Sequence, residues 1–265
     1  MAQQTPSPGR WIRAALVLFP LGLIITSILS FGIWWQKKQA VQARTAAFAR
    51  AMRQDWDEAR LEAASVRLQE AWALKEADPM EVAASYMESS MSAESMGYLP
   101  RRLRLQAASG ALSVVDAEIT GSSRPRRVQL LLLPMQSLSK ESSLSLATVF
   151  ALAHSLSGAI LPETLRFAML PMTNPTQRAL ALQQLASAMA GRSEQLVELT
   201  VLGGSLEPEW RREIQTALAT AASASRLQWV DAPRDAAVAL RVARDLRQRL
   251  LKVQGIEPEG EKGSH

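Results

Sequence analysis

The first 77 residues divide into an apolar segment and a longer polar segment. Residues 14–35 run for 22 positions without a charged side chain. At about 1.5 Å per residue, a helix of this length crosses a hydrocarbon core of about 30 Å. Side chains that favour membrane interfaces flank this run: Arg10, Trp11, Arg13, Trp34, Trp35, Lys37 and Lys38. The pattern predicts a short tail over residues 1–13 and a single transmembrane helix over residues 14–35.

A cleaved signal peptide is the competing interpretation of this segment, because Val41-Gln42-Ala43 ends in a small residue. The apolar run is longer than a usual signal-peptide core, which favours an uncleaved anchor in the inner, or cytoplasmic, membrane. Basic residues are more numerous after the anchor than before it, which favours a cytoplasmic C-terminal domain. The commoner layout of a short tail, an anchor and an exported domain favours the opposite side. We expect an extracytoplasmic domain, and the sidedness stays open.

Residues 36–77 contain no Gly or Pro and are rich in Ala, Arg, Glu and Gln, which predicts a juxtamembrane stalk helix. Two apolar stripes occur at helical spacing, the first with Val41, Phe48, Met52 and Trp56, the second with Leu61, Leu68 and Trp72. An apolar stripe can pack on the helix's own domain or pair with another chain in a homo- or hetero-oligomer. Both interpretations stay open for this stalk.

Residues 78–254 alternate between strand and helix patterns. Strands are predicted at residues 101–106, 111–119, 128–133, 164–170, 196–202 and 226–230, and helices at 78–97, 144–156, 175–190, 208–223 and 233–253. The run VQLLLL at 128–133 is apolar enough for a strand covered on both faces. The alternation predicts an α/β fold, with a mostly parallel mixed sheet, antiparallel edge strands and helices on both faces. The polar residues 255–265 are predicted to form a disordered tail.

The composition of the chain excludes several kinds of catalytic and metal-binding site. The chain has no Cys and only two His, His154 and His265, which excludes cysteine nucleophiles, thiolate metal sites and most imidazole chemistry. We assign His154 no role, because a lone imidazole within a helix is usually structural. The net charge of +5 includes two basic clusters: Arg101, Arg102 and Arg104, and Arg124, Arg126 and Arg127. These clusters could contact lipid headgroups or protect an edge strand from pairing with another chain. Few aromatic residues lie near them, which argues against a nucleic-acid-binding role.

Residues 114–137, VVDAEITGSSRPRRVQLLLLPMQS, carry a family resemblance. They resemble the di-zinc aminopeptidases, a family that includes glutaminyl cyclases and the ectodomains of transferrin receptor and nicastrin. The resemblance extends over roughly residues 79–204, and it rests mainly on the order and spacing of the elements. It implies a zinc-exopeptidase-like fold for residues 78–254.

The positions at which the resemblance implies metal ligands and catalytic carboxylates carry other residues. They are Pro134, Gln136, Lys140, Glu141, Thr173, Asn174 and Thr200. A dinuclear zinc site needs several carboxylate or imidazole ligands and a carboxylate base, and of these positions only Glu141 supplies a carboxylate. We therefore expect a pseudoenzyme whose zinc ligands are lost, with no catalytic residue, no metal and no cofactor.

The leading hypothesis from the sequence is a membrane-anchored pseudo-peptidase that acts as a scaffold or assembly subunit. Its partners would be membrane proteins or subunits of a complex, together with the lipid bilayer itself. An alternative hypothesis keeps the former cleft as a binding site for a peptide or small ligand in a sensor or transport accessory.

Overall fold

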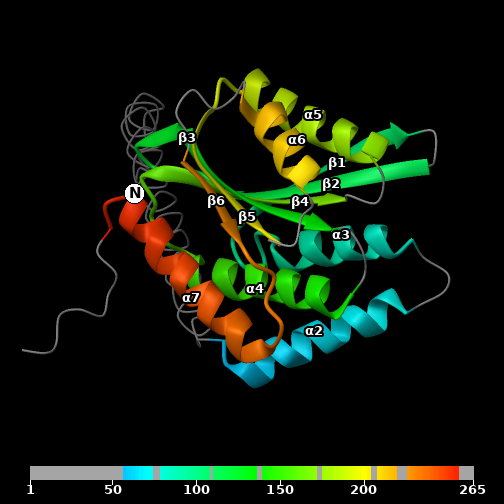
Figure 1. Cartoon of the computed structure of the whole chain (residues 1–265). Helices are drawn as coiled ribbons and strands as arrows, with labels where there is room; N and C mark the ends of the chain where they lie inside the picture. Colours follow the sequence, from blue (N-terminus) through cyan, green and yellow to red (C-terminus); the bar gives the residue numbers. More distant parts are fainter. Residues whose placement is uncertain are drawn as a thin grey trace, which may run out of the picture. The chain divides into compact units, whose positions relative to one another are not determined.

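Six strands form one mixed sheet in the computed structural model of the chain (Figure 1). The structure describes residues 56–73, 78–107, 110–135, 139–171, 175–203, 208–219 and 226–256, all within one unit that spans residues 53–265. The strands are β1 (Leu99–Ala107), β2 (Gly110–Ile119), β3 (Arg124–Met135), β4 (Glu163–Pro171), β5 (Gln195–Leu202) and β6 (Arg226–Val230), in the spatial order β1-β2-β4-β3-β5-β6. The pairs β1–β2 and β2–β4 are antiparallel, whereas β4, β3, β5 and β6 run parallel. This arrangement confirms the predicted mixed sheet with antiparallel edge strands.

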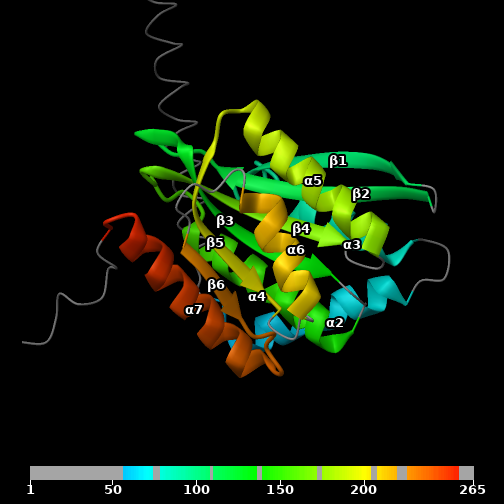
Figure 2. The same cartoon turned by 45° about the horizontal axis from the view of Figure 1, so that its top comes forward.

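The helices cover both faces of this sheet. They are α2 (Glu58–Trp72), α3 (Pro79–Ser90), α4 (Lys140–Leu156), α5 (Pro175–Gly191), α6 (Pro208–Ala219) and α7 (Ala236–Val253). Helices α5 and α6 lie side by side on one face in both views (Figures 1 and 2). Helices α3, α4 and α7 pack on the opposite face, and α2 packs on α4 rather than on the sheet.

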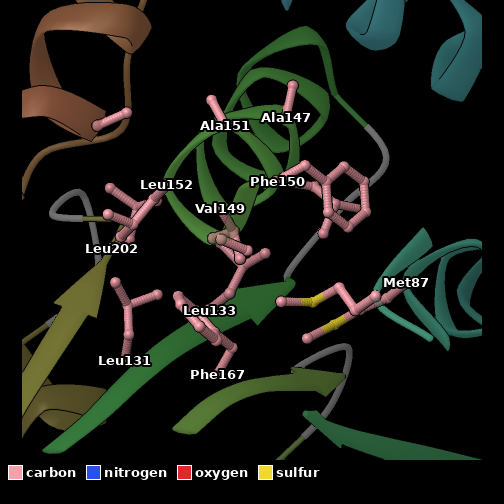
Figure 3. Close-up of a cluster of buried hydrophobic side chains, with 14 of the residues drawn as sticks. Met87, Leu131, Leu133, Ala147, Val149, Phe150, Ala151, Leu152, Phe167 and Leu202 are labelled. Carbon is pink, nitrogen blue, oxygen red and sulfur yellow. The ribbon is translucent and has the colours of Figure 1, made fainter. Parts of the chain in front are cut away.

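Burial on both faces of the sheet explains why residues 128–135 of strand β3 are apolar at every position except Gln129. Successive side chains of a strand point to opposite faces, so Leu131 and Leu133 pack against α4 while Leu130 and Leu132 pack on the α5 and α6 side. In Figure 3, Leu131 and Leu133 lie beneath Val149 of α4. A central strand that is covered on both faces has no solvent-facing positions to fill with polar residues.

The predicted stalk helix over residues 36–77 is interrupted at Asp57. This residue has an extended backbone (φ −96°, ψ 173°), and its carboxylate accepts a hydrogen bond from the Arg60 amide at 2.8 Å. Such a side-chain cap marks the beginning of a helix, so α2 starts at Glu58. Residues 36–55 lie outside the described residues.

Helix α3 is shorter than predicted. Asp78 caps its start by accepting a hydrogen bond from the Met80 amide at 2.9 Å, and the helix ends at Ser90 instead of Gly97. The amides of residues 95–97 bond to the Ser92 carbonyl and close a turn there. Glu81, in the first turn of α3, accepts a hydrogen bond from Ser113 Oγ at 2.8 Å.

The C-terminal helix ends at Val253, as predicted, but begins later than predicted. It begins at Ala236 rather than at residue 233, because Asp235 caps it by accepting a hydrogen bond from the Val238 amide at 2.8 Å. At the other end, Gly255 adopts φ +74° and the Ile256 amide bonds to the Leu251 carbonyl at 2.9 Å. Ile256 packs against the core, so the predicted tail over residues 255–265 is wrong at its first two residues, and residues 257–265 lie outside the described residues.

The predicted anchor over residues 14–35, with its flanking aromatic and basic residues, lies outside the described residues. Within the described part of the chain, no helix combines the length and apolar character needed to cross a bilayer.

Candidate functional site

The carboxyl ends of β3, β4 and β5 meet at one edge of the sheet. From this edge β3 leads into α4 on one face, whereas β4 and β5 lead to α5 and α6 on the other. In open α/β sheets, a crevice forms where neighbouring strands send their connections to opposite faces, and ligands bind there. This edge is therefore the place to look for a site.

Pro134 lies at this edge, as the resemblance implies. It is buried as the second-last residue of β3 and pairs with Leu170 of β4. On the other side, a Cβ placed on Gly203 would lie 3.9 Å from Pro134 Cδ, so the ends of β3 and β5 are adjacent. Gly203 has φ +129°, a backbone conformation that suits glycine. The structure brings these strand ends together around a proline ring.

The other predicted positions are spread along the elements around this edge. Lys140 and Glu141 open α4 and are exposed, just after the capping residue Ser139. Thr200 lies two residues inside β5, pairs with Leu131 and is 1% exposed. Gln136, Thr173 and Asn174 lie outside the described residues.

The residues described here do not fit a dinuclear zinc site. Proline offers no side-chain donor atom, lysine is a cation, and a threonine hydroxyl buried in a strand is a poor substitute for a carboxylate. Across the described ranges, no three or more His, Cys, Asp or Glu side chains converge to hold a metal ion. We therefore derive no chemical step through zinc.

Three carboxylates, those of Asp116, Glu118 and Glu194, surround Arg166 of β4 instead. Its side chain is fully buried, and Nη2 lies 2.7 Å from Glu118 Oε2 and 2.6 Å from Glu194 Oε1. Its Nε lies 3.3 Å from Asp116 Oδ2. The sequence analysis missed this network, although an arginine within the apolar strand ETLRFAMLP was a signal for it.

Burial and neighbouring charges shift the pKa values of two side chains in this network. Burial raises the pKa of Asp116 above its usual value, although Arg166 opposes the change. For Arg166, burial acts to lower the pKa, but the hydrogen bonds to Glu194 and Glu118 outweigh it and hold the pKa above the usual value. Asp116, Glu118 and Glu194 thus share the Arg166 guanidinium as their counter-charge, which is a structural arrangement.

Four of the six arginines in the two predicted basic clusters form ion pairs within the domain. Arg101 contacts Glu118, Arg102 contacts Glu81 and Glu88, and Arg124 and Arg127 contact Glu163. The Arg127 Nε to Glu163 Oε1 distance is 2.8 Å. These pairs favour the structural interpretation of the clusters over contact with lipid headgroups.

Three hollows lie away from the predicted site. A groove of about 680 Å³ lies between α5 and α6. Two smaller pockets, of about 180 and 290 Å³, lie on the opposite face of the sheet and share Trp56 as a wall. None of the three is lined by Pro134, Lys140, Glu141 or Thr200.

Trp56 belongs to the stripe that could either pack on its own domain or bind a partner, and the structure buries it in its own domain. Its side chain is 9% exposed, and its ring lies 6.2 Å from the ring of His154, which is itself buried on α4. The second stripe is buried too, because Leu61, Leu68 and Trp72 form the inner face of α2. Val41, Phe48 and Met52 lie outside the described residues.

Comparisons with known proteins identify the fold. No protein-family model matches the sequence, and no curated protein matches it either. Among solved structures, the chain is similar to a Bacteroides vulgatus protein assigned as a zinc-dependent exopeptidase, with a TM-score of 0.51, 10% identity and coverage of 74% of this chain and 96% of that chain. It also matches a glutaminyl cyclase from Macrostomum lignano, with a TM-score of 0.44, 13% identity and coverage of 73% of this chain and 77% of that one.

A glutaminyl cyclase from Fimbriiglobus ruber matches as well, with a TM-score of 0.40, 12% identity and coverage of 55% of this chain. The present chain spans only 61% of the length of that cyclase. The likeness to the Bacteroides vulgatus protein shows the fold alone, since the sequences share so few residues. The described domain therefore has a zinc-exopeptidase-like fold, as the resemblance of residues 114–137 predicted.

Proposed function

We propose that this chain is a membrane-anchored, non-catalytic scaffold or assembly subunit, whose zinc-exopeptidase-like domain binds protein partners. The anchor part of the proposal rests on residues 14–35 of the sequence. The non-catalytic part rests chiefly on the carboxyl edge of the sheet, where Pro134, Lys140 and Thr200 stand at positions that the resemblance assigns to metal chemistry.

The charge at this edge supports the same conclusion. Lys140 is the first residue of α4, and a helix N-terminus already carries a partial positive charge. A lysine ammonium there adds to that charge and repels a second cation. The neighbouring Glu141 is exposed, with its Oε2 3.5 Å from Ser139 Oγ, the side chain that caps the helix.

The carboxylates that could serve as alternative ligands are already committed. Asp116, Glu118 and Glu194 surround Arg166, and Glu163 pairs with Arg127. Recruiting Asp116, Glu118 or Glu194 to a metal would remove part of the counter-charge of a buried arginine, and breaking a buried ion pair costs on the order of 3–5 kcal/mol.

The groove between α5 and α6 supports a binding role. Its floor is apolar, with Leu182, Ala186 and Ala217, and its rim carries charges of both signs in Arg212 and Glu209. This combination suits an amphipathic helix of a protein partner, which would lay its apolar stripe on the floor and pair its charges with the rim.

Co-purification of the full chain from membranes tests the partner-binding part. We expect the wild-type chain to elute in a complex heavier than its own 29.0 kDa. A186E places a charge on the groove floor and should release the partner, whereas A188E, a matched change of another half-buried alanine outside the groove, should keep it. A wild-type chain that is monomeric in mild detergent, or equal loss in both variants, contradicts the proposal.

Hydrolysis assays test the non-catalytic part separately. The purified full chain, supplied with zinc, should give no chelator-sensitive cleavage of aminoacyl or peptide substrates. Turnover that disappears on chelation and returns with added zinc would show that a metal site forms, and the pseudoenzyme assignment would then be abandoned.

A further inference from the structure

Two pockets meet at Trp56, at the end of the domain where α2 begins. The first, of about 180 Å³, lies between α4 and α7 and is lined by Ser155, Arg244, Arg247 and Gln248. The second, of about 290 Å³, lies beside α2. Figure 1 shows the start of α2 next to α7, so residues far apart in the sequence converge here.

Both pockets are basic. Arg60 and Arg67 line the second pocket, as Arg244 and Arg247 line the first, and among the described lining residues of either pocket there is no Asp or Glu. No ion pair joins any of these four arginines to another residue in the described part of the chain. Arg166, by contrast, has three carboxylates around it.

Two residues that line these pockets carry buried donors without a protein acceptor. Trp56 is 9% exposed, and its indole Nε1 has no hydrogen-bond partner. The Nε of Arg247 is likewise buried and without a partner. Folded proteins satisfy nearly all buried N–H donors, because a buried donor without an acceptor is costly, so unsatisfied donors that converge on a pocket indicate a ligand that accepts hydrogen bonds.

The aromatic ring also positions one of the cations. Arg60 Cζ lies 5.2 Å from the centre of the Trp56 ring, within the range of a cation–π contact. This contact holds the guanidinium at the mouth of the second pocket. The site thus combines fixed donors with positive charge and lacks the carboxylates that would repel an anion.

We propose that the Trp56 site, defined by Trp56, Arg60, Arg67, Arg244 and Arg247, binds a phosphate group. Guanidinium groups match phosphate oxygens with paired N–H donors, which makes arginine the usual residue for recognition of this anion. The pocket volumes suit a phosphate with a small polar substituent. Two sources share this chemistry, namely a small soluble phosphate compound and the headgroup of an anionic lipid.

The experiment uses the full chain in two arms. In the first arm, the chain in zwitterionic detergent is titrated by calorimetry with inorganic phosphate and with glycerol 3-phosphate at constant ionic strength. In the second arm, the chain is placed in nanodiscs of phosphatidylcholine, alone or mixed with phosphatidylglycerol, and hydrogen exchange is followed in residues 56–67 and 240–248. Both arms include R244E/R247E, which reverses two site charges, and R234E/R241E, a matched control whose exposed arginines lie outside both pockets.

We expect binding in one arm, weakened by about tenfold or more in R244E/R247E and retained in R234E/R241E. A signal in the first arm identifies a soluble phosphate compound, and a signal confined to phosphatidylglycerol nanodiscs identifies a lipid headgroup. R60Q/R67Q provides an independent test if R244E/R247E fails to fold. Absence of binding in both arms, or equal loss in the control pair, overturns the proposal.

Discussion

Arg166 shows, at the scale of single residues, how this sheet tolerates charge in its interior. A buried ion pair contributes little to stability relative to well-packed apolar residues, because desolvation offsets the attraction between the charges. Removing one partner is different, since the remaining charges are then buried alone. Asp116, Glu118 and Glu194 all depend on the same guanidinium, which makes the network sensitive at that one position.

We predict that R166M lowers the free energy of unfolding by about 3–5 kcal/mol, because it leaves buried carboxylates without a counter-charge. Urea denaturation of the variant and the wild-type chain measures the change. R192A is the matched control, since Arg192 contacts the same carboxylates but its side chain is 31% exposed, and it should cost about 0–1 kcal/mol. Equal losses in the two variants would show that burial of Arg166 is not what matters.

The ionisation of Glu198 makes the free energy of unfolding depend on pH. It is buried on β5, and burial raises its pKa above the ordinary value of 4.5, although Arg249 and Arg226 oppose the change. The folded state therefore binds this proton more tightly than the unfolded state does. Its contribution to the free energy of unfolding becomes less favourable as the pH rises from about 4.5 through the raised pKa, and it is least favourable at neutral pH.

E198Q removes this titration while keeping the shape of the side chain. We predict that the variant is more stable than the wild-type chain at neutral pH, and that the difference shrinks as the pH falls below 4.5. Urea denaturation over a series of pH values gives the comparison. A difference that stays constant across the series would mean that lost or gained hydrogen bonds, rather than ionisation, set the stability of the variant.

At the scale of elements, the sequence predicted the strands and α4 because their patterns are unambiguous. The apolar run at residues 128–133 fixed β3 as a central strand, and the structure extends it to Arg124–Met135. Helix ends were harder, because single side chains decide them. Asp57 lies in a stretch without Gly or Pro, so composition predicted an unbroken helix over residues 36–77, yet the Asp57 carboxylate caps the start of α2.

The residues that line a site can be predicted from the sequence only where a single strand or helix positions them. Pro134 and Lys140 could be placed at the carboxyl edge from the sequence, because strand order and spacing determine where a strand ends. The Trp56 site could not, since its residues come from α2 and α7 and only tertiary packing brings those helices together. For the same reason the sequence left open whether Trp56 binds a partner, whereas the structure packs its indole inside the domain.

At the scale of the whole molecule, the helices on the two faces of the sheet differ in how much of their surface is buried. Helix α4 lies between the sheet and the outer helix α2, and 13 of its 17 residues are buried (Figure 3). On the other face, α6 has 12 residues, of which Ile214 and Leu218 are the fully buried ones in the described part. Regions that bury little apolar surface open at lower free energy than the core does.

We therefore predict that α6 opens before the rest of the domain. In native-state hydrogen exchange with increasing urea, amides of residues 208–219 should exchange through a local opening of lower free energy, while those of residues 140–156 should follow global unfolding. A partner helix in the groove between α5 and α6 would cover this part of the molecule, so α6 should gain protection in the purified complex and lose it in A186E. Equal protection of α4 and α6 in the isolated chain would show that the two faces unfold as one cooperative unit, and the groove would then be a rigid surface.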